Sequence, residues 1–182
     1  MPAGDNRATS EGETETLSPL LPRDIEEAAA RVLEVACAGE LSLTTAESCT
    51  GGLLASLLTD VEGASHAFER GFVVYSEDAK CELLGIQREQ VERCGAVSKD
   101  VALAMARGAI THSKADIALA ITGFAGKAAD GEEPGLVHFA CAKRDGSAAH
   151  REEHFGDVGR GAVRIASLRV ALEMIEQALH HD

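Results

Sequence analysis

Residues 116–122, "DIALAIT", decide the fold class of this chain. Their apolar residues run almost without interruption, which is typical of a β-strand that is buried on both faces. A strand of this kind needs a layer of helices on each side of its sheet. The segments before and after it should therefore alternate between helix and strand.

The segments before this strand have that alternation. Asp24 is the expected N-cap of an amphipathic helix that stops at Gly39, and a helix is expected to begin immediately after Ser48. Ser98 should cap a longer helix. The expected strands are 41–46 and 71–76, and the expected helices are 24–39, 49–61, 77–85, 88–95 and 99–113.

The segments after the strand complete the pattern. Residues 135–143 and 148–155 flank the turn "RDG" and predict a hairpin, and residues 159–181 predict a long helix. Alternating strands and helices with one late hairpin predict an α/β fold. We expect a three-layer α/β/α sandwich whose sheet is mixed and mostly parallel.

Composition limits the number of domains and the partners. With 45% hydrophobic residues, 182 residues can bury one sizeable core. Residues 1–21 are polar and acidic with almost no apolar periodicity, so we expect a disordered tail followed by one domain at 22–182. The formal charge of −13 opposes binding to nucleic acid or to an anionic membrane surface.

The cysteines and the apolar runs indicate the compartment. Five cysteines form no C-x-x-C pair and no metal-ligand spacing, which is typical of reduced thiols. No stretch approaches 18 consecutive apolar residues, and the N-terminus lacks the pattern of a signal peptide. We expect a cytoplasmic protein that needs no metal or other cofactor, and we expect it to form a homo-oligomer.

Ligands of α/β sheets bind where strands end and helices begin. Three polar or glycine-rich junctions fit that position: 47–52, 75–80 and 122–131. In the first junction, Ser48 has three interpretations: a helix cap, a contact to phosphate, or a nucleophile. Cys49 is a rival nucleophile, since a helix N-terminus lowers the pKa of a thiol, unless it is simply a small buried hydrophobe.

A serine nucleophile needs a base, and none of the seven histidines lies in these junctions. Lys80 fits that role if burial or a neighbouring cation lowers its pKa toward neutrality. Tyr75 lies five residues earlier and would relay or donate a proton. Taken alone, the spacing of the two residues favours an ordinary strand-end aromatic and a solvated lysine over a catalytic pair.

Several sequence blocks in a fixed order resemble the C-terminal domain family of the competence/damage-inducible protein CinA, in the type that consists of this domain alone. The similarity extends from about Asp24 to His180. It rests on these blocks: "TAESCTGG" (45–52), "ERGFVVYSEDAK" (69–80), "LLG" (83–85), "GAVS" (95–98), "MARGA" (105–109), "AD" (115–116) and "TGFAG" (122–126).

The resemblance implies a nicotinamide mononucleotide deamidase, which hydrolyses its substrate to nicotinic acid mononucleotide and ammonia. It implies Ser48 as nucleophile and Lys80 as base, with Tyr75 assisting. A C-terminal arginine would meet the phosphate of this small pyridine mononucleotide; we expect Arg164, with Arg160 as its partner. The expected pocket is shaped by Thr50, Gly51, Gly52, Thr122, Gly123 and Gly126.

A second hypothesis belongs to another class. After Gly126 the loop 127–135 departs from the family pattern "TGIAG" followed by proline and a glycine pair. This departure is compatible with a nucleotide-binding module that has no catalytic activity. The resemblance therefore predicts turnover of the mononucleotide, whereas the altered loop is compatible with binding without turnover.

Overall fold

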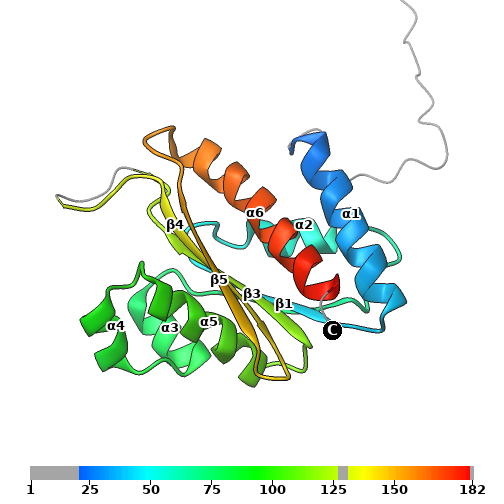
Figure 1. The fold of residues 1–182 in the computed structure, drawn as a ribbon, viewed down its shortest axis with the longest axis horizontal. Helices are drawn as coiled ribbons and strands as arrows, with labels where there is room; N and C mark the ends of the chain where they lie inside the picture. The colour runs from blue at the N-terminus through cyan, green and yellow to red at the C-terminus, as the bar shows by residue number, and fades with distance from the viewer. Residues whose placement is uncertain (1–20, 127–130, 181–182) are drawn as a thin grey trace, which may run out of the picture.

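The computed structural model describes residues 21–126 and 131–180 (Figure 1). Its sheet has the order β2-β1-β3-β4-β5. Strand β1 is parallel to both of its neighbours, whereas β4 is antiparallel to β3 and to β5, so four of the five strands point the same way. The strands are β1 (Leu43–Glu47), β2 (Phe68–Val73), β3 (Ile117–Gly123), β4 (Leu136–Lys143) and β5 (Ala148–His154).

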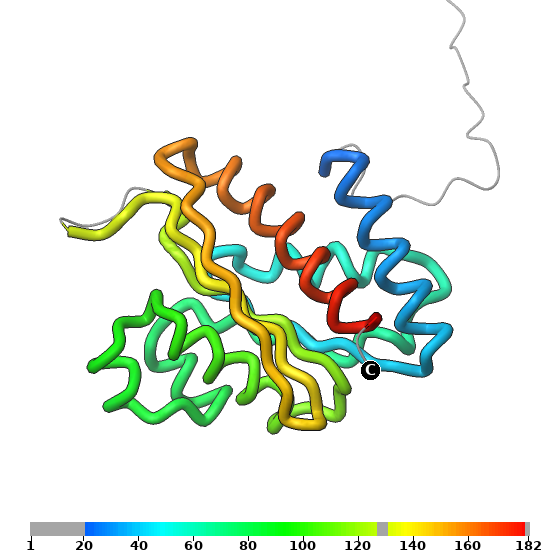
Figure 2. The backbone as a smooth tube through the Cα atoms, viewed as in Figure 1, coloured from blue at the N-terminus to red at the C-terminus, as the bar shows by residue number. Residues whose placement is uncertain are grey.

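Helices cover both faces of this mixed sheet. Helices α1, α2 and α6 lie on one face, and α3, α4 and α5 lie on the other, as Figures 1 and 2 show. The expected three-layer α/β/α sandwich is therefore confirmed. The helices are α1 (Arg23–Ala38), α2 (Leu53–Thr59), α3 (Glu77–Leu84), α4 (Arg88–Cys94), α5 (Lys99–Thr111) and α6 (Arg160–His180).

Strand β3 lies at the centre of the sheet and is buried on both faces, as expected. Its larger side chains, Ile117, Leu119 and Ile121, pack against the α1, α2 and α6 layer. The alternate residues Ala118 and Ala120 face the α5 layer. Alanine side chains are small, so α5 can approach this face of the sheet closely.

Two helix starts differ from the expectation. Helix α1 has Pro22 at its N-cap rather than Asp24, because proline fits the entry to a helix and Asp24 instead pairs with Arg169 of α6 at 2.6 Å. Helix α2 begins at Leu53, because Gly51 and Gly52 have positive φ angles of 62° and 91° that a helix cannot contain. Ser48 is therefore not its cap.

The second strand also differs from the expectation of residues 71–76, since β2 spans 68–73. Pairing with β1 starts at Leu43 and Phe68 and ends at Glu47 and Val73. Ser76 then caps α3 by accepting a hydrogen bond from the amide of Ala79. The expected N-cap of α5, Ser98, is confirmed by its bond from the amide of Val101.

The expected disordered tail falls on residues 1–20, which lie outside the described residues. Leu21 is described and packs in the core beside α1. Within the described part of the chain, none of the helices combines the length and the apolar character that crossing a membrane requires.

Candidate active site

The described parts of the three junctions, 47–52, 75–80 and 122–126, meet at one edge of the sheet, because β1, β2 and β3 run in parallel. The end of β1 pairs with both neighbours: Glu47 is in register with Val73 of β2 and Ile121 of β3. The next residue, Ser48, donates its backbone N–H to the carbonyl of Ile121 at 2.9 Å. Ser48 is therefore placed by the backbone of the central strands.

Lys80 reaches this edge from the first turns of α3. Its Nζ lies 3.1 Å from Ser48 Oγ and 3.0 Å from the carbonyl oxygen of Val74. Only 1% of Lys80 and 8% of Ser48 is exposed. Burial lowers the pKa of Lys80, because the ammonium loses its hydration. The pair thus joins a hydroxyl to an amine that gives up its proton more readily than a lysine in water.

A cleft of about 270 Å³ opens onto this pair. Tyr75 stands at its rim with 66% of its surface exposed, and within the described ranges it makes no hydrogen bond to Ser48 or Lys80. The predicted site residues that line the cleft are Ser48, Tyr75, Lys80, Thr122, Gly123, Gly126 and Arg160. Cys49, Ala96, Val97, Phe124 and Ala125 line it as well.

Cys49 is buried beside the pair, and burial raises the pKa of its thiol to about 12. The expected lowering of that pKa by a helix N-terminus is wrong, because α2 starts four residues later, at Leu53. A thiol of this kind stays protonated at neutral pH and is a poor nucleophile. The interpretation of Cys49 as a small buried hydrophobe fits the structure.

The turn at 48–52 is held by Glu47, which sequence reasoning missed as a functional residue. Its fully buried carboxylate accepts hydrogen bonds from the amides of Gly52, Leu54 and Ala55 at 3.1, 3.0 and 2.8 Å. Three charge-assisted bonds satisfy the free amides at the start of α2. The only signal in the sequence was its place inside "TAESCTGG".

The end of β3 forms the opposite wall of the cleft. Thr122 donates its hydroxyl to the carbonyl of Ala96 at 2.8 Å, which holds the segment before α5 against the strand. At Gly123 an added Cβ would lie 2.7 Å from the carbonyl oxygen of Leu136, so only glycine allows this pairing with β4. Sequence reasoning did not predict four residues of the cleft wall, Ala96, Val97, Phe124 and Ala125. Their signal in the sequence was their place in the blocks "GAVS" and "TGFAG".

The two predicted arginines lie one helical turn apart on α6 but occupy different positions. Arg160 is exposed at the cleft, and a Cβ on Gly126 would lie 3.0 Å from its Nη2. Arg164 is half-buried and donates from Nη2 to the carbonyl of Thr50 at 2.6 Å, beside Gly51. Thr50, Gly51, Gly52 and Arg164 thus build the turn behind Ser48 rather than the cleft wall.

Together the fold and the site define an α/β domain with a buried serine–lysine pair at the carboxyl ends of its parallel strands. The CinA C-terminal domain model matches residues 25–179, and the chain belongs to this family. The resemblance found in the sequence is therefore confirmed.

Curated relatives and solved structures agree with this membership. The chain is 45% identical over 139 residues to "Nicotinamide-nucleotide amidohydrolase PncC" of Escherichia coli, covering 75% of this chain and 83% of that protein. It is 46% identical over 142 residues to a "CinA-like protein" of Chlorobium limicola, covering 76% of this chain and 32% of the other. The crystal structure of a competence/damage inducible protein from Agrobacterium tumefaciens matches with a TM-score of 0.84 and 45% identity, covering 88% of this chain and 98% of that one.

Proposed function

We propose that this chain is a nicotinamide-nucleotide amidohydrolase, which converts nicotinamide mononucleotide and water to nicotinic acid mononucleotide and ammonia. The observation that carries the proposal is the hydrogen-bonded pair of Ser48 and Lys80 in the cleft, 3.1 Å apart. It occurs in a chain that is 45% identical to a protein named for this activity.

The proposed reaction is acyl transfer through serine. Neutral Lys80 accepts the hydroxyl proton of Ser48 while Oγ attacks the carbon of the carboxamide. The lysine then gives this proton to the departing nitrogen, and ammonia leaves an ester between the pyridine carbonyl and Ser48. Water attacks that ester with Lys80 again as base, which releases the carboxylic acid and restores the hydroxyl.

The oxyanion of each tetrahedral intermediate needs hydrogen-bond donors that are not already engaged. In the 48–52 turn, the amide of Ser48 donates to the carbonyl of Ile121, and the amide of Gly51 donates to the carbonyl of Ser48. The amide of Gly52 donates to the carboxylate of Glu47. The amides of Cys49 and Thr50 make no hydrogen bond within the described residues. Of the two, only Cys49 lines the cleft, so we assign its amide to the oxyanion.

The phosphate of the substrate needs a local positive group, because the chain as a whole carries a charge of −13. Arg160 lines the cleft and is exposed, so its guanidinium is available to a ligand. Arg164 already donates to Thr50 and supports the turn. We therefore assign the phosphate contact to Arg160 and a positioning role to Arg164.

The decisive experiment is ammonia release from nicotinamide, its riboside and its mononucleotide by the purified chain. We expect turnover of the mononucleotide, and a loss of about 10³-fold or more in Ser48→Ala. Ser56→Ala is the matched control, because Ser56 is exposed on α2 and should leave the rate unchanged. Undiminished release by Ser48→Ala rejects the nucleophile assignment.

The arginine assignment has its own readout. Arg160→Ala should raise KM for the mononucleotide about tenfold or more, since a hydrogen bond to a charged group contributes about 1.5–3 kcal/mol. The riboside lacks the phosphate, so its KM should not change. An equal loss on both substrates would instead assign Arg160 to the structure of the cleft.

The alternative of a catalytically silent nucleotide-binding module remains testable in the same assay. Its motivation was the loop 127–135, of which residues 127–130 lie outside the described residues. Calorimetric binding of the mononucleotide without ammonia release over hours would support the module, and turnover would exclude it.

A further inference from the structure

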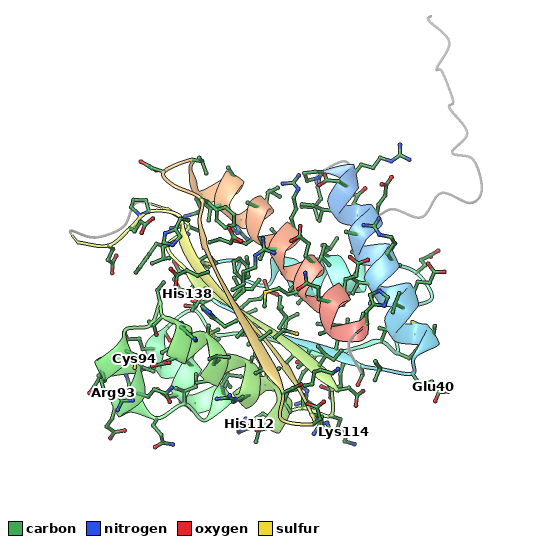
Figure 3. All side chains as sticks on the ribbon, in the orientation of Figure 1. Glu40, Arg93, Cys94, His112, Lys114 and His138 are labelled. Atoms are coloured by element: carbon green, nitrogen blue, oxygen red, sulfur yellow. The ribbon has the colours of Figure 1, made fainter. Side chains whose placement is uncertain are left out.

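Two histidines and a carboxylate gather on β4 and β5, outside the residues that line the cleft. His138 of β4 is in register with Glu152 of β5, and His150 lies two residues before Glu152, so all three side chains share one face of the sheet. Figure 3 labels His138 between the strands and the layer of α3, α4 and α5. The potential ligand atoms of the three residues all lie within 4.8 Å of one another.

Two of the three separations in the cluster are close to those of a tetrahedral metal site. His138 Nδ1 lies 3.1 Å from His150 Nε2 and 3.4 Å from Glu152 Oε2. Zinc bonds of about 2.0–2.2 Å to nitrogen and oxygen place tetrahedral ligands about 3.3–3.5 Å apart. The side chains therefore need only small adjustments to hold such an ion.

A single hydrogen bond from His138 cannot serve both of its neighbours in this cluster, although Glu152 Oε1 also pairs with His154 Nε2 at 3.0 Å. His138 Nδ1 faces both His150 Nε2 and Glu152 Oε2, but one imidazole nitrogen carries at most one proton and so donates to one partner at a time. A neutral imidazole has a free lone pair on its unprotonated nitrogen. A cation would accept a lone pair from all three groups together.

We propose that His138, His150 and Glu152 bind one zinc ion, which ties the edge strand β5 to β4. Two imidazoles with one carboxylate suit zinc, whereas magnesium and calcium prefer sites made of oxygen ligands. The Glu152 side chain is 44% exposed, so a fourth position at its side is accessible to water.

This site would lie close to the cleft without belonging to it. His138 is in register with Thr122 of β3, which lines the cleft. A zinc ion here would therefore fix the strand beside the cleft wall. The proposal does not depend on the amidohydrolase activity, since it concerns residues that take no part in the reaction described above.

The test is a calorimetric titration of the full chain, stripped of metal by a chelator, with zinc chloride at pH 7.5. We expect one zinc ion per chain, and a loss of at least about tenfold in affinity in both His150→Ala and Glu152→Gln. His138 itself is a poor position for a test substitution, because it is only 6% exposed and its truncation would leave a cavity. Magnesium chloride should give no binding heat.

His66→Ala is the matched control, because His66 is exposed in the loop between α2 and β2 and should not affect zinc binding. Zinc should also raise Tm of the native chain and of the control, but not of His150→Ala. The free cysteines are rival ligands, and cobalt in place of zinc would reveal them by a thiolate charge-transfer band. Unchanged affinity in both cluster variants, that band, or no zinc binding to the native chain would overturn the proposal.

Discussion

The most unusual single residue of the domain is Lys80, one of the largest fully buried side chains in the structure. A lysine is rarely buried, because its ammonium loses hydration that two hydrogen bonds replace only in part. Here those bonds go to Ser48 Oγ and the carbonyl of Val74. The neutral amine that burial favours is the form that a general base requires.

Lys80→Met should therefore separate activity from stability. We expect it to abolish ammonia release. Because burial lowers the pKa of Lys80 in the folded chain, the unfolded chain binds more protons between that pKa and the ordinary value of 10.5. The free energy of unfolding of the native chain should then rise with pH across this window, and the methionine variant should lack this rise.

The measurement is Tm of both chains between pH 6 and pH 10. The variant's Tm relative to the native chain should fall as pH rises, because each unit of lowered pKa corresponds to about 1.4 kcal/mol, or about 3–5 °C in a chain of this size. The change of this Tm difference with pH is diagnostic, because the loss of the hydrogen bond to Val74 lowers the stability of the variant by the same amount at every pH. A difference that stays constant over this range would contradict a lowered pKa.

A second prediction at this scale concerns Cys49. Burial raises the pKa of its thiol to about 12, so the reactive thiolate is almost absent at pH 7.5. Iodoacetamide at this pH should therefore leave ammonia release nearly unchanged, although Cys37, Cys81 and Cys94 are less buried and can react. Mass spectrometry would show which thiols were modified, and rapid inactivation that follows modification of Cys49 would contradict the prediction.

At the scale of elements, the start of α2 is the feature that places the nucleophile. A helix start leaves free amides, and here the carboxylate of Glu47 binds three of them from the end of β1. Arg164 of α6 binds the carbonyl of Thr50 in the same turn. The turn that carries Ser48 is thus fixed from β1 and from α6.

Glu47→Ala should destabilise the domain by about 3 kcal/mol or more, because it leaves three amides of a largely buried turn without their acceptor. Glu47→Gln keeps one acceptor oxygen and should cost about 1–2 kcal/mol. Urea unfolding gives these values, and ammonia release should fall with them as the turn loosens. The control Glu89→Ala, at an exposed position of α4, should stay within about 0.5 kcal/mol of the native chain. Equal stability of Glu47→Ala and the control would refute the capping role.

The elements that sequence reasoning predicted correctly depend on local patterns. Strand β3 is marked by its continuous apolar run, the β4–β5 hairpin by its short turn, and α5 by the cap at Ser98. The start of α2 was missed because it depends on two positive φ angles and on a carboxylate five to eight residues away in sequence. Position in the sequence alone could not show that Lys80 is buried, since that depends on how α3 packs.

At the scale of the whole molecule, the charge of −13 acts on any charged substrate before it reaches the cleft. Nicotinamide mononucleotide carries a positive pyridinium ring and a phosphate with nearly two negative charges at pH 7.5, so it is a net anion. Its riboside has lost the phosphate and is a cation. The same protein field should therefore repel one substrate and attract the other.

Salt should consequently change the two KM values in opposite directions. The Debye length falls from about 30 Å at 0.01 M ionic strength to about 8 Å at 0.15 M, which screens the distant carboxylates more than a direct contact at Arg160. Between these two ionic strengths we expect KM for the mononucleotide to fall by roughly two- to fivefold and KM for the riboside to rise, with kcat unchanged for both. Steady-state ammonia release in sodium chloride at fixed pH measures this. A KM for the mononucleotide that rises with salt would show instead that the arginines give the cleft a positive local field that outweighs the charge of the rest of the chain.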